Sequence, residues 1–142
     1  MEFKINFIAI GVAVIANFVL GYLWYTPLFG KVWGKEMGYD PNMKPSQKEF
    51  VKGIFYMLLG NFLCAWVLAH NITAWQFVPD VKEMGKISNA MSSAIFTWLG
   101  FYFPVHLGST VWEQKSWKLV GINAGYHLAS LLLLSFIITF CN

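Results

Sequence analysis

Four long stretches of this sequence contain no Lys, Arg, Asp or Glu. They cover residues 5–30, 53–79, 87–112 and 119–142. Each is longer than the ~20 residues that an α-helix needs to cross the hydrocarbon core of a bilayer, which is about 30 Å thick. The spacing of the charges therefore predicts four membrane-spanning helices.

Composition and backbone chemistry favour the same fold class. The chain is 57% hydrophobic and 12% charged, whereas about a quarter of the residues are charged in a typical soluble domain. Unpaired backbone groups are too costly in lipid for an open sheet, and the spans lack the alternating pattern of a barrel. We therefore predict an all-α integral membrane four-helix bundle. It forms one domain, residues 1–142, with spans at about 5–29, 51–70, 88–112 and 118–140.

The basic residues indicate how the helices are oriented. All ten are Lys; seven lie in the predicted loops 30–52 and 113–118, and the other three are Lys4, Lys82 and Lys86. Cytoplasmic loops carry an excess of basic residues, so we expect both of these loops in the cytoplasm and both termini outside. The absence of Arg, which suits planar phosphate recognition, argues against a nucleic-acid partner. The expected partner is the lipid bilayer.

Shorter patterns lie between the spans. Loop 30–52 is expected to hold a short helix at about 31–37, and Ser46 with Glu49 predicts a capping box at the start of the second span. The segment between about 70 and 86 is predicted to be irregular. A tight turn is predicted at 113–118.

The ends of the first and third spans resemble one another. Both contain an aromatic residue, a proline two positions later and then a glycine and a Val-Trp pair, at 25–33 and 102–112. The likeness predicts two helical hairpins related as a parallel repeat, about an axis along the membrane normal. Chance similarity between aromatic-rich span ends explains it equally well.

Polar residues inside the fourth span follow a helical period. Asn123, Tyr126 and His127 occupy positions i, i+3 and i+4, on one face of a helix. The other face has small residues, which allow another helix to approach closely: Gly121, Gly125 and Ala129. We expect this face to pack against a second copy in a homo-oligomer.

Depth along the helices brings several polar side chains to one level. Counted from the turn near residue 115, His106 and His127 lie at similar heights, and Trp24 reaches the same level when counted back from Gly30. We therefore hypothesise a ligand-binding intramembrane pocket with Glu113 at its mouth. Its lining is predicted to comprise Asn17, Trp24, Tyr25, His106, Asn123, Tyr126 and His127. The alternative is that these groups only link helices by hydrogen bonds.

Three functions fit these features. The first is binding or permeation of a small polar solute or a proton. Four helices enclose little volume, so a permeation path is expected to need a homo-oligomer. The second is a membrane enzyme or redox subunit in which His106 and His127 hold a haem or metal. The third is a structural or assembly partner in the membrane. No phosphate loop, zinc-ligand spacing or nucleophile motif is present, so we expect no catalytic residues and no cofactor under the first interpretation.

Two strings carry a resemblance to a known family. They are Gly-Tyr-Leu-Trp-Tyr-Thr-Pro-Leu-Phe-Gly-Lys-Val-Trp at 21–33 and Ile-Asn-Ala-Gly-Tyr-His at 122–127. They resemble a bacterial family of small four-span membrane proteins catalogued as domain of unknown function 1761, and the likeness covers almost the whole chain. The resemblance implies a four-helix protein of the cytoplasmic (inner) membrane. It implies no activity.

Overall fold

The computed structural model describes residues 2–142, and this part of the chain is helical without any strand. Two short segments, named η1 and η2, are π-helices. The elements follow in the order α1 (Phe7–Leu23), η1 (Trp24–Leu28), α2 (Gly30–Met37), α3 (Gln47–Trp75), α4 (Pro79–Glu83), α5 (Gly85–Thr97), η2 (Trp98–Tyr102), α6 (Phe103–Trp112) and α7 (Trp117–Phe140).

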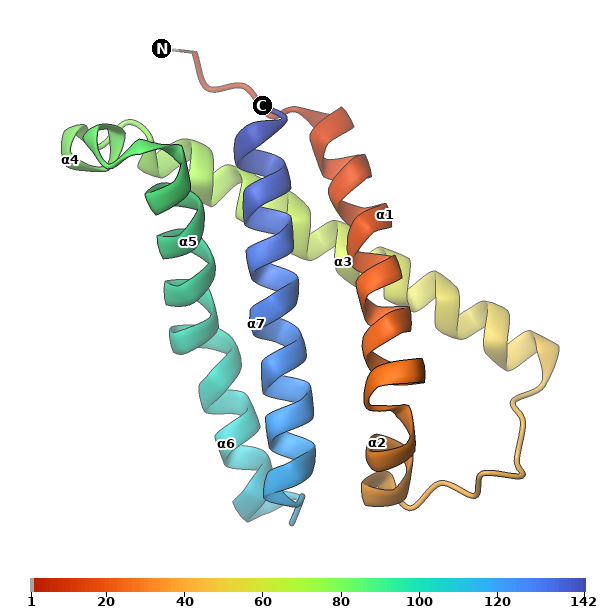
Figure 1. Ribbon diagram of the computed structural model, residues 1–142. Coiled ribbons are helices and arrows are strands. Elements are labelled where there is room, and N and C mark those ends of the chain that lie inside the picture. The colour runs from red at the N-terminus through yellow and green to blue at the C-terminus, as the bar shows by residue number, and fades with distance from the viewer. Residues whose placement is uncertain (1) are drawn as a thin grey trace.

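Within residues 2–142, three helical segments are long and apolar enough to cross a membrane. They are Phe7–Leu28, which joins α1 to η1, then α3, and α7. The predicted span 88–112 is instead divided among α5, η2 and α6, which follow one another without a break. Figure 1 shows α5 and α6, which η2 joins, running beside α7 from one end of the molecule to the other.

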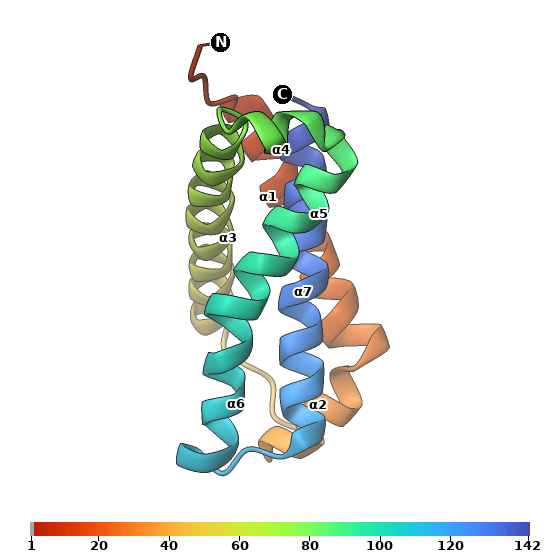
Figure 2. The same ribbon diagram turned by 90° about the vertical axis from the view of Figure 1, so that its left-hand side faces the viewer.

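Helix α7 occupies the middle of the arrangement. It contacts α1 on one side and α5, η2 and α6 on the other, while α3 packs on both α1 and α7. Helix α3 crosses behind α7 and α1 at a steep slant (Figure 1), and the view in Figure 2 shows it flanking the other helices. Most of its first half therefore leaves the bundle with its side chains exposed.

Both termini lie at one end of the molecule, and one side chain links them. The Asn6 side chain accepts hydrogen bonds from the backbone N–H groups of Ile8 and Ala9, which caps α1. The same side chain donates through Nδ2 to the backbone oxygen of Cys141 at 2.8 Å. The start of α1 and the end of α7 are thereby held together.

Several boundaries differ from the sequence-based prediction. Helix α3 begins four residues earlier and ends five residues later than the predicted span 51–70. The prediction of an irregular segment at about 70–86 is wrong, because α3 continues to Trp75 and Pro79 then opens α4 from its first turn. Gly85, with φ of 82°, allows the turn from α4 into α5. The predicted helix near 31–37 and the capping box of Ser46 and Glu49 are confirmed.

The π-helix η1 follows from the position of a proline. Pro27 has no backbone N–H and cannot donate to a preceding turn. The helical turn is wider here. The backbone N–H of Phe29 donates to the carbonyl oxygen of Trp24, five residues earlier, at 2.9 Å. The next residue is Gly30, where an added Cβ would lie 2.6 Å from the carbonyl oxygen of Tyr25. Only glycine fits this junction between η1 and α2 without a shift of the backbone.

The apolar core is concentrated in the half of the molecule that contains the termini. It is formed by buried side chains of α1, α3, α5 and α7: Ile10, Ala13, Ala65, Leu68, Ala69, Ile72, Ala94, Leu131, Leu134 and Ile138. Many large apolar residues of the same helices are exposed, including Phe50, Val51 and Phe55 on α3. An exposed apolar surface of this extent is expected where the solvent is lipid.

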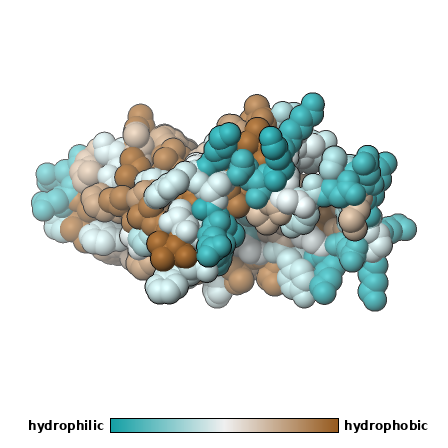
Figure 3. Space-filling model, turned by 90° about the horizontal axis from the view of Figure 1, so that it is seen from below, coloured by the Kyte–Doolittle hydropathy of each residue, from teal (hydrophilic) through white to brown (hydrophobic). Residues whose placement is uncertain are grey.

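The opposite end carries the loops 38–46 and 113–116. Seen from this end, hydrophilic residues gather over much of the surface and hydrophobic ones lie between them (Figure 3). Lys115 and Glu113 form an ion pair of 2.9 Å in the second of these loops.

We predict that Gly30→Ala destabilises the protein, because its methyl group would collide with the backbone at Tyr25. A loss of about 1–3 kcal/mol in the free energy of unfolding is expected for such overpacking. The matched control is Gly34→Ala in α2, where an added Cβ meets nothing within 4 Å. Unfolding in detergent, followed by circular dichroism, measures both; equal stabilities for the two variants would contradict the structure of this junction.

Candidate functional site

Two tryptophans hold α7 from two sides. Trp24, the first residue of η1, donates through Nε1 to the backbone oxygen of Ile122 at 3.0 Å. Trp98, the first residue of η2, donates in the same way to the backbone oxygen of Ala124 at 2.8 Å. Residues two apart on an α-helix face directions roughly 200° apart, so α7 lies between the two indoles. We name this pair of contacts the tryptophan clamp.

The clamp depends on a small residue in α7. The ring of Trp24 lies against Gly125, where an added Cβ would be 3.3 Å from one ring carbon and 3.7 Å from another. Gly121, one turn earlier, has open space, and Ala129, one turn later, is half-buried. The middle residue of the predicted packing face is therefore covered by this chain's own Trp24. Packing of the face on a second copy stays a prediction.

Polar aromatic side chains of η1 and α7 meet beside the clamp. The hydroxyl of Tyr25 donates to Asn123 Oδ1 at 2.8 Å. The ring of Tyr126 lies 5.1 Å from that of Tyr25 and 6.3 Å from that of Trp24, measured between centroids. Its hydroxyl faces Gly21, where an added Cβ would be 3.1 Å away. Tyr126 is buried by these contacts.

The two predicted histidines meet beside Tyr126, whose ring centroid lies 5.2 Å from that of His127. Their rings, from His106 in α6 and His127 in α7, are stacked with centroids 5.1 Å apart. The ring of Tyr102, at the end of η2, lies 4.8 Å from that of His127. The Tyr102 hydroxyl is hydrogen-bonded to Cys64 Sγ of α3 at 3.3 Å. Side chains of α3, η2, α6 and α7 thus form one chain of contacts, which we name the histidine cluster: Cys64, Tyr102, His106 and His127.

Six of the eight predicted pocket residues are joined by these contacts: Trp24, Tyr25, Asn123 and Tyr126, and, through the contact of Tyr126 with His127, also His127 and His106. The other two make further contacts. Asn17 lies near Tyr126 and donates to Asn61 of α3 at 2.8 Å, and Glu113 forms its exposed ion pair with Lys115. Binding of a ligand by these side chains stays a prediction.

Sequence reasoning missed Tyr102 and Cys64 as members of the cluster. Tyr102 precedes His106 by four residues, so the two share a helix face, and this spacing could have identified it. Cys64 has no comparable signal, because its contact depends on how α3 crosses the other helices. Within residues 2–142 no group of three or more His, Cys, Asp or Glu side chains is arranged to hold a metal ion.

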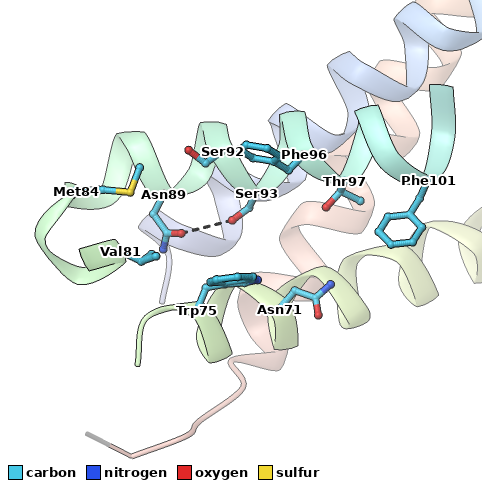
Figure 4. Close-up of a pocket in the computed structure, with 10 residues that line it drawn as sticks. All are labelled: Asn71, Trp75, Val81, Met84, Asn89, Ser92, Ser93, Phe96, Thr97 and Phe101. Carbon is cyan, nitrogen blue, oxygen red and sulfur yellow. Dashed lines mark hydrogen bonds between the residues drawn. The ribbon is translucent and has the colours of Figure 1, made fainter. Parts of the chain in front are cut away.

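A cavity of about 470 Å³ lies outside the predicted pocket, between α3 and α5. Figure 4 shows Asn71 and Trp75 of α3 on one wall and residues of α5 on the other. The α5 wall carries a polar stripe with a spacing of four residues: Asn89, Ser93 and Thr97. This spacing is visible in the sequence, but the prediction concentrated on the histidines and did not use it.

These features define a helical protein with apolar segments long enough to cross a membrane and with polar aromatic side chains gathered around one central helix. Residues 8–139 match the family described as protein of unknown function (DUF1761), and the chain belongs to this family. The two strings that suggested the family, at 21–33 and 122–127, provide both residues of the Tyr25–Asn123 hydrogen bond and one indole of the clamp with its acceptor. Comparisons with curated proteins and with solved structures gave no match.

Proposed function

We propose that α5, η2 and α6 together make a fourth membrane crossing, so that the chain forms a four-helix bundle in the cytoplasmic membrane. The support is the uncharged stretch 87–112 and the unbroken path of these segments beside α7 (Figure 1). The relation of the two hairpins by a parallel repeat stays part of this proposal. The likeness of 25–33 to 102–112 aligns Tyr25 with Tyr102, and their hydroxyls bond Asn123 of α7 and Cys64 of α3, which supports such an exchange of partners.

The function that the geometry supports best is binding or passage of a small polar solute or a proton at the histidine cluster. The stacked contact of His106 with His127 is the observation that carries it. Ionisable side chains are rare inside membrane spans and commonly mark ion or proton paths. An imidazole changes its charge near neutral pH, and two in contact provide adjacent sites between which a proton can move.

The surrounding side chains give this site fixed hydrogen-bonding groups. The ring of Tyr102 lies against His127 while its hydroxyl bonds Cys64, and the hydroxyl of Tyr25 bonds Asn123, which is one turn before His127 on α7. None of these groups carries a fixed charge, so a neutral polar solute finds donors and acceptors there. The tryptophan clamp sets the height of α7 and hence the height of His127 relative to His106.

A complete path across the bilayer is proposed to need a second copy. The apolar core occupies much of the half of the molecule that contains the termini, and the buried polar groups there include the hydroxyls of Thr73, Ser135 and Thr139. We propose that these hydroxyls alone do not make a continuous path through one chain. The exposed Gly121 and the half-buried Ala129 are the candidate contact residues on α7.

We predict that the double variant His106→Ala/His127→Ala, reconstituted in vesicles, loses most of the flux supported by the unmodified chain. Proton entry is followed with an internal pH dye under a potassium diffusion potential, and entry of glycerol or urea by light scattering. The control is His70→Ala, which removes the one other histidine. Its Nδ1 bonds the Trp66 oxygen of its own helix and lies apart from the cluster.

Three results would contradict this proposal, and each favours a different alternative. Full flux in the double variant would leave the histidines without a role in transport. A Soret absorption band or stoichiometric metal in the purified protein, lost in the double variant, would favour the haem or metal interpretation. A large fall in thermal stability in the double variant, with no flux in the unmodified chain, would favour a structural role.

We predict that Cys141 reacts with a membrane-impermeant maleimide on intact spheroplasts, because both termini are proposed to lie outside. Cys141 is exposed, whereas Cys64, the other cysteine, is half-buried within the bundle. The Cys141→Ser variant is the control and should remain unlabelled. Labelling of Cys141 only in inverted membrane vesicles would reverse the proposed orientation.

A further inference from the structure

Two adjoining hollows lie at the end of the molecule that holds the termini. The larger is the cavity of about 470 Å³ between α3 and α5, and the smaller, of about 220 Å³, lies at the α4–α5 turn. Both are lined by Val81 and Asn89. They therefore form one continuous surface that passes from the α4–α5 turn into the space between the helices.

The chemical character of this surface changes along its length. The smaller hollow is lined by Lys82, Lys86 and Gln76, which provide two positive charges and an amide. The middle has only uncharged hydrogen-bonding groups, namely Asn89 and the hydroxyls of Ser92 and Ser93. The far part is lined by Phe96 and Phe101 on α5 and η2, together with Thr97, and Trp75 on α3 lies opposite Asn89 and Ser93 (Figure 4).

Asn89 lies at the junction and has hydrogen-bonding capacity to spare. The residue is only 6% exposed, and its Oδ1 accepts from Ser93 Oγ at 3.5 Å. Among residues 2–142 its Nδ2 has no hydrogen-bond acceptor. Figure 4 shows this amide directed into the space between α5 and Trp75. Since Asn89 lines both hollows, its amide nitrogen is free to donate to an acceptor of a molecule bound there.

The two lysines are also without anionic partners. Neither Lys82 nor Lys86 lies within 4 Å of a carboxylate among the described residues. This holds although Asp80 and Glu83 lie in α4 with Lys82. Lys86 Nζ lies 5.9 Å from the ring centroid of Phe140 at the end of α7. The positive charge at the hollow is thus left for an external anion.

We propose that this surface is a binding site for an anionic glycerophospholipid of the surrounding bilayer. The phosphate lies between Lys82 and Lys86, and an ester carbonyl accepts the hydrogen bond from Asn89 Nδ2. The start of one acyl chain lies along Phe96, Phe101 and Trp75. The order of positive, amide and aromatic groups matches the order of phosphate, ester and hydrocarbon in such a lipid.

The size and position of the surface agree with this ligand. The larger cavity falls within the roughly 300–1,000 Å³ typical of small-molecule sites. Its aromatic residues Phe96 and Phe101 are largely exposed at the outer surface of the helices, so an acyl chain can continue from the cavity into the bilayer. The site is separate from the histidine cluster and does not depend on transport through it.

The test measures binding of phosphatidylglycerol and phosphatidylcholine with identical chains to the delipidated full-length protein, by native mass spectrometry from detergent. Tighter binding of phosphatidylglycerol is expected. The variant Lys82→Gln/Lys86→Gln should bind phosphatidylglycerol roughly tenfold more weakly or worse and lose the preference. The matched control is Lys48→Gln/Lys52→Gln, which removes two charges at the same spacing from the start of α3.

A second variant tests the amide independently of charge. Asn89→Leu should weaken binding of both lipids, since each has ester carbonyls, and Ser93→Val should do so if Asn89→Leu does not fold. Equal affinity of the unmodified chain for the two lipids would overturn the proposal. So would an equal loss in both double lysine variants, which would show only general attraction between opposite charges.

Discussion

The arrangement of this protein depends on how one helix backbone accepts two side-chain hydrogen bonds. The indole N–H groups of Trp24 and Trp98 donate hydrogen bonds to the carbonyl oxygens of Ile122 and Ala124, from opposite sides of α7. In lipid, apolar burial adds little to helix association, so close packing and interhelical hydrogen bonds determine how the helices fit together. Gly125 permits the first contact, because any side chain there would meet the Trp24 ring.

The clamp divides the molecule into two chemically different halves. Towards the termini, α1, α3, α5 and α7 pack through small and branched apolar side chains. Towards the loops, α3 slants away from α7. The contacts there are made by aromatic and histidine side chains of α7 and its other neighbours: Tyr25, Tyr126, His106 and His127. The polar side chains thus gather where helix packing is least complete, and this is the half in which we propose the site for a polar solute or a proton.

Periodicity and charge spacing predicted much of this from the sequence. The helical character, the capping box at Ser46 and the shared level of His106 and His127 follow from patterns within single helices, because rise and rotation per residue are fixed. The path of α3 across the bundle has no such signal. This is why the hydrogen bond of Asn17 with Asn61 and the contact of Cys64 with Tyr102 were not predicted.

The π-helices explain another limit of the sequence. A π-turn adds a residue to the turn and rotates everything beyond it relative to a regular α-helix. Because η2 lies between Thr97 and Tyr102, counting regular helical turns from Asn89, Ser93 and Thr97 does not give the face on which Tyr102 and His106 lie. The cavity between α3 and α5 was overlooked although its stripe of Asn89, Ser93 and Thr97 has a regular helical spacing.

The most direct measurement is the free energy of unfolding of Trp24→Phe, Trp98→Phe and the double variant, since phenylalanine keeps an aromatic ring but cannot donate. Trp112→Phe/Trp117→Phe is the control, because these tryptophans are 87% and 70% exposed. The clamp predicts a loss of about 0.5–1.5 kcal/mol for each single variant, a larger loss for the double variant and none for the control. Equal stability of the double variant and the control would show that the clamp does not hold α7.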